Sequence, residues 1–275
     1  MPCRTARGRL VLLGLGLLAC LLALTAPAQG QLVRWLRLNP ENLTTLDVAV
    51  EMHLGTRSAR VVAFQRTRRS AISAARFVGA DGEQRLEAQI ADQEALIVSL
   101  KTDTLARGPG WVVIDLEKET REWTVQRWRA FLEAEGLTDP APARAQAAQK
   151  VRVEGHVFLK ALVHRGNSER GKAVVSPVGQ ELELVPLADP VGLRGNMLPV
   201  RLLHRGKPMP GAVVHAAATD APAEWAGTTD AKGEALVPLP AVGTYVMSST
   251  VLESRAEGSG VDVVFATSSV TLQRR

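Results

Sequence analysis

Short runs in which apolar and polar residues alternate occur along most of this chain, and they constrain its fold more than any other feature. In "LDVAVEMHL", residues 46–54, Val48, Val50, Met52 and Leu54 share one face and His53 falls on the opposite one. The runs "RVVAFQ", "ALIVSL" and "GWVVIDL" are short, apolar and rich in β-branched residues. A period of two is typical of strands with one buried face. The pattern predicts a mostly β protein made of two β-sandwich-like domains.

One segment has the helical period instead. In "EWTVQRWRAFLEAEGL", Val125, Trp128, Phe131 and Leu132 fall on one face of a 3.6-residue repeat. Thr124 is suited to cap the start, and Gly136 is suited to the left-handed stop. The segment predicts a single α-helix near residues 124–135, inserted in the first domain and packed through its apolar stripe.

The stretch "TTDAKGEALVPLPAVGTYV", residues 228–246, has the glycines, lysine and threonines of a phosphate loop but not their order. A phosphate loop places its Gly-Lys-Ser/Thr before a helix, whereas here Lys232 precedes Gly233 and a β pattern follows. The side chain of Asp230 is suited to bond the backbone ahead of it, and Gly233 is suited to a positive φ. We therefore expect a hairpin corner of a β-sandwich in which Ala235, Val237 and Leu239 point inward.

The first 28 residues have the composition of a secretory signal peptide. Basic residues precede the apolar run 10–24, and "APA" at residues 26–28 is a small-x-small site, which predicts cleavage after Ala28. A second interpretation stays open, because "LLAC" resembles a bacterial lipobox in which Cys20 becomes the lipidated first residue. Both interpretations predict an exported, periplasmic protein that meets the membrane only through the signal peptide or a lipid anchor.

The cysteine content and the net charge exclude some classes of structure and function. Cys3 and Cys20 are the only cysteines, so cleavage after Ala28 leaves a fold without disulfides or thiolate chemistry. Removing residues 1–28 takes away three arginines and no acidic residue, which lowers the formal net charge from +5 to +2. No basic run with interleaved aromatics remains, so nucleic acid is not an expected partner. The break near Ser176 predicts one domain over 29–176 and a second over 177–275.

Several quoted segments carry a family resemblance. "GKPMPGAVVHA", "TTDAKGEALVPL" and "GTYVM" resemble the Ig-like sandwich of carboxypeptidase-regulatory and Cna-B-type modules. The segment "GQELELVPLADPVGLRGNMLPVRLLHRGKPMPGA" resembles a bacterial periplasmic family of unknown function that is labelled NikM-like, the periplasmic component of a cobalt or nickel transporter. The resemblance implies an Ig-like second domain, Ni²⁺ or Co²⁺ as ligand, and an envelope or transporter partner. The chain departs from that family at Leu32 and Val251, where its members carry histidines.

The five histidines show no metal-binding spacing. None of them pairs as H-x-H, H-x-x-x-H or HExxH, and an isolated surface imidazole is the ordinary interpretation of each, with His215 on a wet face. A composite site across strands remains open, and its weak candidate ligands are His156, His164, His204 and His215. Glu181 and Glu183 alternate with leucines, which indicates a half-exposed strand whose carboxylates face solvent.

No catalytic signature appears, so no catalytic residue and no certain cofactor are predicted. The sequence lacks G-x-S-x-G, S-x-x-K and a paired-carboxylate motif. We expect an exported, non-enzymatic binding or accessory protein, linked by resemblance to nickel or cobalt uptake. The alternative is a structural or protein-interaction Ig-like module of the cell envelope that binds no metal.

Overall fold

The computed structural model describes residues 32–39, 47–56, 61–64, 72–86, 88–89, 97–101, 108–165, 172–219 and 224–274. Strands account for 57% of the structure and helices for 12%, which confirms the mostly β expectation and a β-sandwich-like fold. The predicted cleavage site at Ala28 and the lipobox residue Cys20 lie outside the described residues.

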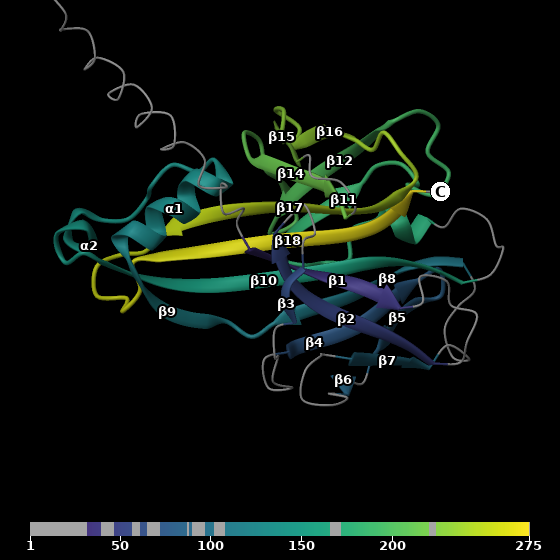
Figure 1. Cartoon of the computed structure of the whole chain (residues 1–275), viewed down its shortest axis with the longest axis horizontal. Coiled ribbons are helices and arrows are strands. Elements are labelled where there is room, and N and C mark those ends of the chain that lie inside the picture. Colours follow the sequence, from purple (N-terminus) through teal and green to yellow (C-terminus); the bar gives the residue numbers. More distant parts are fainter. Residues whose placement is uncertain are drawn as a thin grey trace, which may run out of the picture.

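The largest sheet, sheet B, runs through the centre of the molecule (Figure 1). Its described strands are, in spatial order, β15 (Glu224–Thr228), β14 (Val213–Ala218), β17 (Gly243–Ser254), β18 (Val263–Arg274), β10 (Lys150–Arg165), β8 (Gly108–Leu116), β4 (Ile72–Gly79) and β5 (Gly82–Arg85), with β9 (Glu119–Thr124) paired to the start of β10. The central pair β10 and β18 is parallel, with Val153 opposite Val263 and Ala161 opposite Thr271. This pair joins the two segments on either side of Ser176, and the division into two domains there stays a prediction.

Two smaller sheets cover sheet B. Sheet A contains β1 (Leu32–Asn39), β2 (Asp47–Thr56), β7 (Ile97–Lys101), β6 (Ala88–Gln89) and β3 (Val61–Phe64). Sheet C contains β11 (Leu182–Pro186), β12 (Met197–His204), β13 (Lys207–Pro208) and β16 (Glu234–Pro238). Figure 1 shows β6 and β7 of sheet A below the long strands β10, β17 and β18, and β12 and β16 of sheet C above them.

Successive side chains along the strands of sheet B pack alternately against sheet C and against sheet A. On β8, Trp111 and Val113 belong to the core shared with sheet C, whereas Val112 and Ile114 belong to the core that contains Leu36 of β1. Successive side chains of a strand point to opposite faces, so a run that is apolar at every position is suited to a central layer. The continuous apolar run "GWVVIDL" is therefore buried between two layers.

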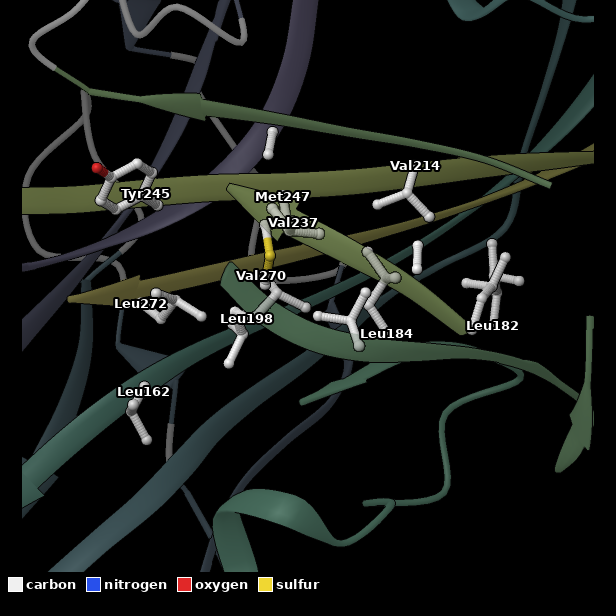
Figure 2. Packing of buried hydrophobic residues seen from close by; sticks show 14 of the residues in the cluster. Leu162, Leu182, Leu184, Leu198, Val214, Val237, Tyr245, Met247, Val270 and Leu272 are labelled. Carbon is white, nitrogen blue, oxygen red and sulfur yellow. The ribbon is translucent and has the colours of Figure 1, made fainter. Parts of the chain in front are cut away.

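The core between sheets B and C is formed by the residues that the sequence places inward. Leu198, Val200 and Leu202 of β12 are fully buried in it. Figure 2 shows Leu184, Leu198 and Val237 of sheet C meeting Val214, Met247 and Val270 of sheet B. This packing confirms the predicted inward faces of β12 and β16.

The helix lies where the sequence predicts it. Helix α1 (Val125–Glu135) begins after Thr124, whose hydroxyl accepts a hydrogen bond from the Arg127 N–H, and it ends at Gly136 with φ +64°. Its four apolar stripe residues are buried in a third core, against β9, β10 and β18. The Ala-rich segment that follows forms the short helix α2 (Ala143–Ala147), and a 3-10 turn spans Lys172–Val175.

The corner at residues 229–233 is confirmed, but the predicted hairpin is wrong. β15 pairs with β14 in sheet B, and β16 pairs with β12 in sheet C, so the chain passes from one sheet to the other. Oδ1 of Asp230 accepts hydrogen bonds from the N–H groups of Lys232 and Glu234, and Gly233 has φ +72°. The residues of the turn are enough to predict the turn itself. The strand with which β16 pairs is not predicted by them, because that strand is distant in sequence.

Candidate functional site: a charged seam between two sheets

A line of charged side chains lies where β10 of sheet B meets the start of β11 in sheet C. Residues with even numbers on β10 point toward sheet C, because Leu162 and Phe158 belong to the core shared with it. We call this line the charged seam, and it comprises Glu154, His156, Lys160, Glu181, Glu183, His204, Arg205 and Glu253.

The inner end of the seam is a fully buried ion pair. Nζ of Lys160 lies 2.7 Å from Oε1 of Glu183, and the two side chains are 0% and 1% exposed. Nζ also lies 4.8 Å from the ring centroid of Trp111, a cation–π distance. Burial lowers the pKa of Lys160, and the neighbouring carboxylate of Glu183 offsets that effect only in part. Charges buried this deeply persist in folded proteins when they are paired.

Backbone groups complete the surroundings of the Glu183 carboxylate. The N–H of Val178 donates to Oε1 at 2.8 Å, and the N–H of Gly179 donates to Oε2 at 3.0 Å. The expectation that Glu181 and Glu183 share an exposed strand face is therefore wrong for Glu183. β11 is buried along its whole length, because the leucines face the core and Glu183 faces Lys160.

The middle of the seam is His156, which is only 4% exposed. Its Nε2 lies 2.8 Å from Oε1 of Glu154, two residues earlier on the same face of β10. Its Nδ1 lies 3.3 Å from Oε2 of Glu181, which precedes β11. His156 is thus not an isolated surface imidazole but connects sheet B to sheet C.

The outer end of the seam is organised around Glu181. Its second oxygen, Oε1, accepts hydrogen bonds from Nη2 of Arg205 at 2.9 Å and from Nε at 3.1 Å. Partial burial alone would raise the pKa of Glu181, but the hydrogen bonds from Arg205 and His156 outweigh it and lower the pKa below its usual range. Nη2 of Arg205 also lies 3.1 Å from Oε1 of Glu253 on β17. The hydrogen bonds that Arg205 donates to the two carboxylates raise the pKa of its guanidinium.

A tight turn presents Arg205 to these carboxylates. Arg205 and Gly206 connect β12 to β13 and have φ values of +51° and +74°. Positive φ at both central residues is the geometry of a type I′ hairpin turn, which an arginine adopts less readily than Asn or Gly. His204 precedes the turn, with Nε2 at 3.6 Å from Oε1 of Glu253 and 3.9 Å from Oε1 of Glu181.

The structure brings together two of the four candidate histidines. His156 and His204 both contact Glu181. His164 lies at the other end of β10, opposite Pro109 of β8, and is not part of the seam. In the part of the chain that the structure describes, no group of three or more His, Cys, Asp or Glu residues is arranged to hold a metal ion. Metal ligation by any of the four stays a prediction, and the side chain of His53 lies outside the described residues.

His215 lies in a separate place, and its predicted wet face is wrong. It is 6% exposed, with Nδ1 at 3.2 Å from Oε1 of Glu224 and Nε2 at 3.3 Å from the backbone oxygen of Glu135. The C-terminal end of helix α1 covers this face of β14. Strand periodicity alone gave no sign that a helix from an earlier segment would lie there.

One sequence signal could have located the seam. Lys160 stands inside "VFLKALV", an otherwise apolar strand, and a lysine at such a position requires a buried partner. "ELELV" supplies that partner from beyond the domain boundary that the sequence predicts near Ser176. The pairing itself joins residues 23 positions apart and is visible only once the sheets are assembled.

The fold and the seam define a layered β-sandwich protein in which sheets B and C share an apolar core that is bordered by the charged seam. The chain belongs to the family described as a domain of unknown function, DUF4198, which matches residues 41–253. No curated protein matches the chain. Within the described residues, no helix is both long and apolar enough to cross a membrane.

Proposed function

We propose that the protein is an exported, non-enzymatic binding or accessory protein of the periplasm. The observation that supports the non-enzymatic part is the state of His156. A general base needs a free lone pair within reach of a substrate. Both ring nitrogens of His156 face carboxylates within the fold, and the ring is almost fully buried. The charged seam therefore has the properties of a structural contact between sheets B and C. A hydrolytic or transfer activity that a point mutation abolishes would contradict the proposal.

Export is supported by the leader-like first 28 residues. Expression of the full chain in a Gram-negative host, followed by intact-mass measurement of the periplasmic and membrane fractions, tests it. The expected species begins at residue 29, after Ala28. A species that begins at a lipid-modified Cys20 would show that the exported protein is anchored to the membrane by a lipid. A chain that keeps residues 1–28 in the cytoplasm would contradict export altogether.

The resemblance to the NikM-like family supports nickel or cobalt uptake as the particular role. His156, His204 and Glu181 are of the ligand types that Ni²⁺ and Co²⁺ accept, and they lie in one network. Calorimetric titration of the chelator-treated mature protein with each metal tests this role. Binding at a simple ratio that is lost in His156→Gln/His204→Gln but retained in His164→Gln would support it.

A structural or protein-interaction role without metal is the second candidate, and the arrangement around Arg205 favours it. The guanidinium already pairs with Glu181 and Glu253, the carboxylates that a metal ion near His204 would use. Absence of binding heat and of thermal stabilisation by either metal would favour this candidate. Tight, stoichiometric metal binding by the purified protein with no partner present would exclude it.

A further inference from the structure

The described strands at the two ends of sheet B differ in character. At one end lies β5, which carries Glu83 and Arg85, and charged side chains on an edge strand oppose pairing with another chain. At the other end lies β15, where Ala226, Gly227 and Thr228 follow one another. In the part of the chain that the structure describes, β15 pairs with β14 alone, and Figure 1 shows it at the end of the sheet away from sheet A. The β15 end of sheet B is therefore the one suited to accept a further strand.

The register with β14 determines which backbone groups of β15 point outward. The N–H of Thr229 donates to the backbone oxygen of Ala212, which continues the ladder just beyond the end of β15. Alternate residues of an antiparallel strand bond the same neighbour, so Trp225 and Gly227 bond β14, whereas the N–H and C=O groups of Ala226 point away from it. The side chain of Ala226 is exposed and small. An incoming strand can therefore reach these backbone groups.

We propose that a second copy of this protein occupies this edge, so that the β15 strands of two subunits pair antiparallel about a two-fold axis at Ala226. Ala226 then faces Ala226 of the partner subunit, and each donates its N–H to the backbone oxygen of the other. Glu224 faces the partner's Thr228, and Thr228 faces the partner's Glu224. Closed two-fold dimers are the commonest homo-oligomers. The inference goes beyond the proposed function and does not depend on it.

The length and charge of β15 select this register. Among antiparallel registers, only the one centred on Ala226 pairs all 5 residues of one β15 with the 5 residues of the other. It also places Glu224 opposite a threonine, whereas a register centred on Glu224 would bring two carboxylates opposite each other, which is destabilising. The ladder cannot extend past Thr228, because the N–H of Asp230 bonds the backbone oxygen of Glu234 where the chain turns toward sheet C.

The face of β15 toward sheet C suits the same pairing. The ring of Trp225 lies over Gly227, where an added Cβ would be 2.3 Å from Cζ2 of the ring. In the dimer Trp225 lies opposite Gly227 of the partner subunit, which has no side chain to displace a ring. Trp225 is half-buried and packs against the core between sheets B and C. The pairing therefore continues this core across the two-fold axis and covers the exposed part of each ring.

Sedimentation equilibrium of the mature protein tests the dimer. The expected result is a concentration-dependent mixture of monomer and a species of twice its mass. Ala226→Pro removes both central hydrogen bonds, because proline has no N–H, and it leaves the ladder with β14 intact. The dissociation constant of the dimer should rise by about tenfold or more. A wild type that is monomeric at all concentrations would overturn the proposal and leave an extended peptide of another protein as the occupant of this edge.

Glu83→Pro is the matched control on β5. The N–H of Leu86 donates to the backbone oxygen of Ala75, so by the same alternation the N–H of Glu83 points away from β4. This variant makes the same change at the opposite end of sheet B and should leave the dissociation constant unchanged. If Glu83→Pro weakens the dimer as much as Ala226→Pro does, the contact is not at β15.

A charge-swap experiment tests the register and does not need the proline variant to fold. Ala226→Lys and Ala226→Glu each bring like charges opposite each other across the two-fold axis, so each variant alone should dimerise more weakly than the wild type. Mixed in equal amounts, the two should form dimers with one copy of each, in excess of random mixing, as measured by native mass spectrometry. The melting temperature of each variant checks that the fold is retained. A mixture without this excess would show that the pairing about Ala226 is wrong.

Discussion

Lys160 and Glu183 form an ion pair of 2.7 Å across the interface of sheets B and C, with at most 1% of either side chain exposed. Breaking such a pair from one side leaves a buried charge without a partner, which typically costs about 3–5 kcal/mol. We expect Lys160→Met to lower the free energy of unfolding by about that amount, measured by denaturant titration.

The double variant Lys160→Met/Glu183→Gln serves as the control for this prediction. The amide that replaces the Glu183 carboxylate would carry no charge, and its oxygen would still accept a hydrogen bond from the backbone N–H of Val178 or Gly179. We therefore expect the double variant to be more stable than Lys160→Met alone. A double variant that is less stable by the sum of both single effects would show that the two charges are independent.

Glu181 should contribute to the acid sensitivity of the fold. Hydrogen bonds from Arg205 and His156 overcome the effect of partial burial and lower its pKa, so the unfolded chain binds the proton more readily than the folded one. Its stabilisation is then fully present above the pKa of the unfolded state and is lost as the pH falls through the lower pKa of the folded state. The stability difference between wild type and Glu181→Gln should thus shrink between about pH 5 and about pH 2.

Glu122→Gln is the matched control for Glu181. Glu122 forms a 2.8 Å pair with Lys150, but both side chains are at least half exposed. Exposed pairs contribute little to stability, so this variant should follow the wild type through the acid range. A stability difference for Glu181→Gln that does not change with pH would mean that the carboxylate has no role in acid unfolding.

The core between sheets B and C should respond strongly to truncation of Leu184. This side chain is fully buried at the centre of the packing in Figure 2. Leu184→Ala should lower the free energy of unfolding by about 2–5 kcal/mol, from lost burial and the cavity left behind. Leu236→Ala, on β16 of the same sheet but 59% exposed, should change it by about 0.5 kcal/mol or less. Equal effects at the two positions would contradict the layered arrangement.

Gly233 is expected to tolerate no side chain at the corner between β15 and β16. Its φ is +72°, and a Cβ there would lie 2.8 Å from the Met209 nitrogen and 3.0 Å from the Leu202 oxygen, both backbone atoms. Gly258 has a φ of +86° but open space around it. Gly258→Ala should cost about 1–2 kcal/mol for the left-handed conformation. Gly233→Ala should cost more in the same denaturant titration, and equal costs would show that the corner can open.

The amino-acid sequence by itself determined the elements whose signals are local. Helix α1 is defined by its 3.6-residue stripe, the Thr124 cap and the Gly136 stop, all within 13 consecutive residues. The inward faces of β12 and β16 follow from a period of two, and the corner follows from Asp230 and Gly233. Each of these features depends on the conformational preferences of neighbouring residues, which are the same before and after folding.

Only the tertiary structure decided which distant segments meet. The parallel pairing of β10 with β18, the burial of His215 under helix α1 and the contacts of Glu183 with Lys160 all join residues far apart in the chain. Alternation shows that one face of a strand is buried but does not specify the surface that buries it. A carboxylate on the other face of the strand is solvated if nothing covers that face. It is half of a buried ion pair if another sheet packs there. The charged seam therefore belongs to the assembled sheets, because its energetics depend on the exclusion of water between them.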